Sequence, residues 1–134
     1  MTSDESSFVR LVLRANAVFS LGTGLLLAIA PATVGEWLGV SIDGWLRVLG
    51  LALVGHFVLL LWAASLPDVG PLARLNLLSI APYPLLMIVL SVAVIDRTIG
   101  QVLLLVDGAV VGSLAVALWA GLRGRRVLAQ SQPA

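Results

Sequence analysis

Residues 99–121 read IGQVLLLVDGAVVGSLAVALWAG, and Asp107 is the single charged side chain in this run. A membrane-crossing helix needs roughly 20 consecutive, mainly apolar residues, and this segment is long enough. A carboxylate in the middle of such a helix is costly in hydrocarbon, so it needs a partner inside the protein. The stretch therefore predicts a membrane helix bundle and marks Asp107 as the first residue to follow for function.

The composition of the whole chain agrees with this prediction. Its 134 residues are 60% hydrophobic and 11% charged, with a mean hydropathy of +1.07, whereas soluble domains are about a quarter charged. Cysteine is absent and all eight basic residues are arginines, which excludes disulfides, thiolate metal ligands and lysine Schiff bases. The arginines are scattered and the net charge is +1, so we expect no nucleic-acid partner.

We expect one all-α domain over residues 1–126, an up-down-up-down bundle of four transmembrane helices. The apolar segments that predict it are 9–30, 44–65, 72–95 and 99–121. Pro82 and Pro84 predict a kink in the third helix, because proline lacks an N–H group and clashes with the preceding turn. Pro31 followed by Gly39 predicts a short interfacial helix. Residues 127–134 are predicted to form a disordered cytosolic tail.

The first span has an alternative interpretation as a cleaved signal peptide, because Ala28, Ile29 and Ala30 resemble a cleavage box. Pro31 directly after the cut and the length of the apolar stretch favour a retained helix. Arginine placement then predicts the orientation. Six arginines fall on the side that both termini share and only Arg47 and Arg97 on the other, so the positive-inside rule places both termini in the cytosol.

Arg47 is the expected partner of Asp107. At ~1.5 Å of rise per residue, Asp107 lies about 13 Å and Arg47 about 5 Å below the outer surface, within reach of each other if the second and fourth helices adjoin. We favour a structural ion pair that locks the bundle. The alternative is an Asp107 that carries a proton or a cation. Gly108 and Gly112 form a small-xxx-small pair, which allows close approach of a helix within the bundle or in a homodimer.

Other polar side chains fall near the same depth. The first span carries a stripe of polar and small residues, namely Asn16, Ser20, Thr23 and Gly24. We favour packing of this stripe against protein over a water-lined cavity. His56, the single histidine, is expected to form hydrogen bonds to the third helix, a second subunit or lipid, because a transition metal would need further ligands. The candidate intramembrane polar site is Asp107, Arg47, His56, Tyr83, Ser20 and Asn16, with no catalytic residue, metal or cofactor assigned.

Two stretches, VRLVLRANAVFSLGTG (9–24) and WLRVLGLALVG (45–55), resemble the small four-helix bacterial membrane proteins called DoxX-like. Those proteins are about this long, with an early arginine in the first helix and glycines further along. The resemblance covers all four spans and implies a place in the bacterial cytoplasmic membrane. Some members are similar to subunits of membrane-bound oxidoreductases that meet quinone, which implies an accessory subunit or a binder of lipophilic molecules.

We therefore expect a non-enzymatic accessory or scaffold protein that holds a lipid, a quinone or a partner helix against its kinked third helix. Membrane lipids, a lipophilic small molecule and a second copy or larger membrane complex are the expected partners. The first alternative is a small proton-coupled transporter that uses Asp107. Small multidrug resistance proteins are similar in having four spans and one essential membrane carboxylate, although theirs lies in the first helix. The second alternative is a membrane oxidoreductase subunit, with His56 and Tyr83 as its acid–base pair.

Overall fold

The structure, a computed structural model, describes residues 3–130 and the side chains of residues 6–123. In this part of the chain the helices are α1 (Ser3–Ile29), α2 (Pro31–Leu38), α3 (Asp43–Ser65), α4 (Gly70–Ile80), α5 (Tyr83–Ala93) and α6 (Thr98–Gln130). Four segments are long and apolar enough to cross a membrane: Ser6–Ile29, Asp43–Ser65, Gly70–Ala93 and Thr98–Arg123. The predicted all-α, four-span fold is confirmed, with α4 and α5 together forming the third span.

The outer surface of the bundle is apolar along its length. Large side chains such as Ile29, Leu78 and Val92 are more than 70% exposed. Water would not favour a continuous surface of this kind on a soluble monomer. Hydrocarbon does favour it, because helices form their backbone hydrogen bonds internally while their apolar side chains face lipid.

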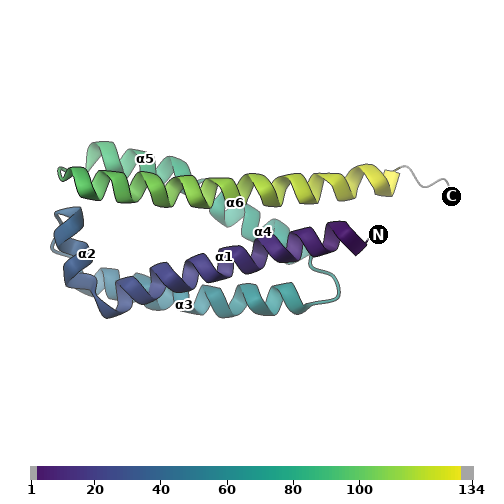
Figure 1. The fold of residues 1–134 in the computed structure, drawn as a ribbon, viewed down its shortest axis with the longest axis horizontal. Helices are drawn as coiled ribbons and strands as arrows, with labels where there is room; N and C mark the ends of the chain where they lie inside the picture. The colour runs from purple at the N-terminus through teal and green to yellow at the C-terminus, as the bar shows by residue number, and fades with distance from the viewer. Residues whose placement is uncertain (1–2, 131–134) are drawn as a thin grey trace.

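The helices form two pairs, with α1 packed along α3 and α5 packed along α6 (Figure 1). The start of α1 and the end of α6 lie at the same end of the bundle, here called the terminal end, and α2 lies at the opposite end (Figure 1). The main core joins α1, α3, α4 and α6 near the terminal end. Its buried residues include Val9, Leu13, Ala17, Leu60, Ala64, Val69, Ala73, Leu118 and Leu122.

Two glycines let the backbones of α1 and α3 touch. A Cβ atom on Gly50 would lie 2.5 Å from the backbone nitrogen of Ala28 and 2.6 Å from the carbonyl oxygen of Gly24. A Cβ atom on Gly24 would likewise lie 2.8 Å from the carbonyl oxygen of Gly50. Small residues at a crossing allow the close packing by which membrane helices associate. This crossing therefore fixes the α1–α3 pair.

The third span breaks where its prolines predict. Helix α4 ends at Ile80 and α5 begins at Tyr83, with Ala81 and Pro82 between them. The N–H of Leu86 donates to the carbonyl of Pro82 over 3.2 Å and restarts the helical pattern. The predicted kink is confirmed, and its cause is the missing N–H and the ring of each proline.

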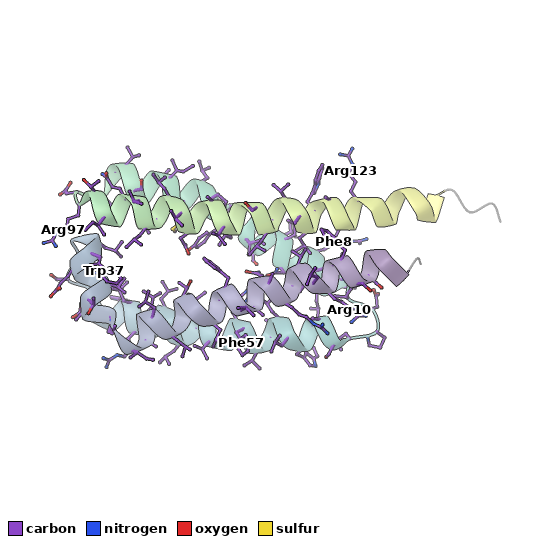
Figure 2. All side chains as sticks on the ribbon, in the orientation of Figure 1. Phe8, Arg10, Trp37, Phe57, Arg97 and Arg123 are labelled. Carbon is purple, nitrogen blue, oxygen red and sulfur yellow. The ribbon has the colours of Figure 1, made fainter. Side chains whose placement is uncertain are left out.

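Helix α2 bridges the two pairs at its end of the bundle. Gly39 ends α2 with φ of 75°, a left-handed conformation that glycine adopts freely. The guanidinium of Arg97 donates to the carbonyl of Glu36 over 2.7 Å. A Cβ atom on Gly100 would lie 2.8 Å from the carbonyl oxygen of Trp37, so α6 starts directly against α2. Figure 2 places Arg97 and Trp37 together there. The predicted short helix is confirmed.

At the terminal end, Arg10 of α1 binds the last turn of α3. Its guanidinium donates to the carbonyl of Ala64 and, over 3.1 Å, to the carbonyl of Pro67. A cation is favourable beside the free carbonyls of a helix C-terminus. Helix α6 continues to Gln130, past residue 127, where the tail was expected to begin, because its arginine-rich end still has good helix formers. Residues 131–134 of that predicted tail lie outside the described residues.

Candidate functional site

Asp107 pairs with Tyr83 in the middle of the bundle. Tyr83 is the first residue of α5, directly after the break, and Asp107 lies on α6. The Tyr83 hydroxyl donates a hydrogen bond to Oδ2 of Asp107, and the bond is partly buried. Two sequence-predicted site residues are thus brought together, by the same break that turns the start of α5 toward α6.

The prediction that Asp107 forms an ion pair with Arg47 is wrong. Arg47 lies exposed near the start of α3, and α3 packs against α1 and α2. Helix α6 packs mainly against α5, α1 and α4, with α2 at its start. Asp107 and Arg47 lie at compatible depths in their spans. However, the helices that pack mainly against α6 are others than α3, which carries Arg47. The partner of Asp107 is therefore the neutral phenol of Tyr83.

A second polar group lies on the other side of the bundle. Nδ2 of Asn16 on α1 donates to Oδ1 of Asn76 on α4 over 3.5 Å, and both side chains are buried. His56 on α3 also has a polar interaction with Asn76. Asn76 belongs to the third span, which is one of the three neighbours expected for His56. Nδ2 of Asn76 is buried without a hydrogen-bond partner, an uncommon state for a polar atom.

Sequence reasoning missed Asn76. The signal was available, because Asn76 is an amide inside an apolar span, the same property that marks Asn16. Ser20 is buried on α1 one turn beyond Asn16, and Thr23 is half-buried. The stripe on the first helix thus packs against protein, the arrangement favoured over a water-lined cavity.

The expected single polar layer is divided into two parts. The Tyr83–Asp107 pair belongs to α5 and α6, whereas Asn16, His56 and Asn76 belong to α1, α3 and α4. An apolar cluster packs around Tyr83 and contains Ile80, Val111, Ala115, Phe19 and Leu77. Near-equal depth along the spans therefore does not join all six candidate residues in one site.

An apolar groove runs along the outside of α5 and α6. It encloses about 650 Å³ and is lined by Pro84, Met87, Ile88, Leu105, Gly108, Ala109, Gly112, Ser113, Val116 and Ala117. Its floor is tight, because a Cβ atom on Gly108 would lie 3.0 Å from Cβ of Met87 and one on Gly112 would lie 3.1 Å from Cγ of Pro84. Small residues on α6 thus shape the groove, and Pro84 borders it at the break.

Tyr83 and Asp107 do not line the groove, although their chain neighbours Pro84 and Gly108 do. At ~100° per residue, Ala109 and Val116 lie about half a turn from Asp107 around α6. The hydroxyl of Ser113 is already bonded, since it donates to the carbonyl of Ala109 over 2.8 Å. The lining therefore offers an apolar surface, suited to a hydrocarbon chain.

The described residues contain no group of three or more His, Cys, Asp or Glu side chains that could hold a metal ion. Comparisons of the chain with protein-family models, with curated proteins and with solved structures find no match. The resemblance to DoxX-like proteins stays a prediction.

Proposed function

We propose that this chain is a non-enzymatic accessory protein that holds the apolar chain of a membrane lipid in the α5–α6 groove. Its four apolar helices make it a multi-pass membrane protein. The arginine distribution supports an orientation with both termini in the cytosol, and the bacterial inner membrane is the location that the resemblance to DoxX-like proteins implies. The groove is the observation that carries the proposal.

Three properties of the groove support a hydrocarbon occupant. Its volume of about 650 Å³ lies within the range of known ligand pockets. Its one lining hydroxyl, that of Ser113, is bonded to its own helix. It also opens toward the surrounding lipid, because Ile88, Leu105 and Val116 are exposed. The apolar tail of a quinone meets the same requirements, which keeps an oxidoreductase accessory role within this proposal.

Filling the groove tests this function. Ser113→Leu adds apolar volume at an exposed lining position and removes a hydroxyl that bonds only to its own helix. Ser79→Leu is the matched control, because Ser79 is exposed on α4 outside the groove and also bonds to its own helix, at the carbonyl of Asn76 over 2.7 Å.

The measurement is native mass spectrometry of the full chain released from lipid nanodiscs, counting the lipids retained. We expect Ser113→Leu to retain several-fold less lipid than wild type and Ser79→Leu to match wild type. Equal retention by all three proteins would overturn the proposed function. Loss of dimers instead of lipid in Ser113→Leu would assign the groove to a partner helix, which its small residues also suit.

One observation favours the transporter alternative. Asp107 is paired with a neutral phenol rather than with a cation, and a carboxyl group without a cationic partner is free to exchange a proton. This alternative predicts that Asp107→Asn abolishes proton-driven flux in proteoliposomes. The accessory function predicts that the same variant retains lipid like wild type, because Asp107 lies outside the groove.

A further inference from the structure

The surface that forms the groove continues along α6 to a tryptophan–arginine pair. At ~100° per residue, Trp119 and Arg123 lie within about 20° of Gly112 around the helix. The Arg123 guanidinium stacks over the Trp119 ring, 4.9 Å from its centroid. Trp119 is half-exposed, and Figure 2 shows Arg123 pointing away from α1 near the terminal end. The groove and this cation thus share one face.

The spacing along α6 suits a phospholipid. Arg123 comes two residues after Gly121, where the apolar run of the fourth span ends, and headgroups lie next to the ends of such apolar runs. The ten residues from Ser113 to Arg123 cover about 15 Å, which is half of a hydrocarbon core of roughly 30 Å. An acyl chain of the leaflet next to Arg123 therefore reaches the groove residues Gly112, Ser113, Val116 and Ala117, beside Pro84.

The arginines at the C-terminal end of α6 favour an anionic headgroup. Guanidinium groups bind phosphate oxygens through a planar fork of N–H donors, and stacking on Trp119 holds that plane while leaving its edge open. After Asp107 the sequence contains three arginines and no acidic residue. This end of α6 is therefore positively charged, which complements a lipid with net negative charge.

We propose that the occupant of the groove is an anionic phospholipid, with an acyl chain between α5 and α6 and its phosphate bound by Arg123. The proposal rests on the proposed function and adds the headgroup class and the residue that recognises it. Trp119 acts as a positioning residue for the guanidinium.

The test compares the full chain with Arg123→Gln and Arg74→Gln in nanodiscs of equal phosphatidylglycerol and phosphatidylcholine. Arg74 is the matched control because it is an exposed arginine on α4 outside the groove. Native mass spectrometry gives the ratio of the two lipids retained. We expect wild type and Arg74→Gln to enrich phosphatidylglycerol over phosphatidylcholine. In Arg123→Gln this enrichment ratio should be about fivefold lower, because one arginine near a headgroup contributes about 1 kcal/mol.

The proposal is overturned if wild type retains both lipids equally, or if the two arginine variants give the same ratio. Ser113→Leu in the same experiment separates the two proposals. If it lowers total lipid while Arg123→Gln leaves the ratio unchanged, the groove function stands and the headgroup assignment fails. If it leaves lipid unchanged while Arg123→Gln lowers the ratio, the groove function fails and Arg123 binds headgroups without it.

Discussion

At the residue scale, the hydrogen bond from Tyr83 to Asp107 replaces the ion pair that depth alone suggested. Hydrogen bonds to ionisable groups contribute about 1.5–3 kcal/mol in water-soluble proteins, and side-chain bonds within membranes average about 0.6 kcal/mol. We therefore expect Tyr83→Phe to lower the free energy of unfolding by about 1 kcal/mol.

A double-mutant cycle measures this pair in bicelles by reversible unfolding. In an Asp107→Leu background, Tyr83→Phe should lower the free energy of unfolding by less than about 0.5 kcal/mol, because the acceptor is already gone. Equal losses in both backgrounds would show that the hydroxyl and the carboxylate do not stabilise the fold through each other.

The residue scale is also where sequence reasoning reached its limit. The sequence places Asp107 and Tyr83 in the membrane and Pro82 at a break, because these properties depend on local composition. It does not determine that α3 packs beside α1, which leaves Arg47 away from α6. Asn76 was missed although the rule for buried polar residues in membranes covers it.

At the element scale, the Gly24–Gly50 crossing holds α1 and α3 together. Gly50→Ala would place its new carbon 2.5 Å from a backbone nitrogen, so the helices must separate. We expect a loss of about 1–3 kcal/mol in the free energy of unfolding, the usual cost of overpacking. Gly55→Ala is the control on the same helix, since nothing lies within 4 Å of its added carbon.

The control should be neutral or up to about 1 kcal/mol more stable, because alanine has the higher helix propensity. Unfolding of both variants in the same bicelles measures the difference. If Gly50→Ala is as stable as Gly55→Ala, the close α1–α3 contact is contradicted.

Helix boundaries and breaks were largely predictable from sequence. Pro31 and Gly39 delimit α2, and Pro82 separates α4 from α5. These boundaries are predictable because proline and glycine act on the local backbone. The groove was not predictable in this way. It depends on which face of α6 the α5 helix leaves uncovered after the break, and on the side chains of two elements that meet only in the folded bundle.

At the scale of the whole molecule, the two helix pairs have different surroundings. The α1–α3 pair is closed by a glycine crossing, and the polar residues Asn16, His56 and Asn76 gather between it and α4. The α5–α6 pair carries an open apolar groove, and Trp119 and Arg123 lie further along the same face of α6. The bundle therefore combines a closely packed α1–α3 pair with an α5–α6 pair that bears the groove to which we assign a lipid chain.

The claim that a lipid chain occupies the α5–α6 groove is tested most directly by photo-crosslinking with a phospholipid that carries a diazirine on its acyl chain. The full chain is irradiated in vesicles, and mass spectrometry locates the labelled residues. We predict that labels concentrate on the groove residues Pro84, Gly112, Ser113, Val116 and Ala117. Labels spread evenly over exposed residues elsewhere, such as Ile29, Leu78 and Val92, would contradict it.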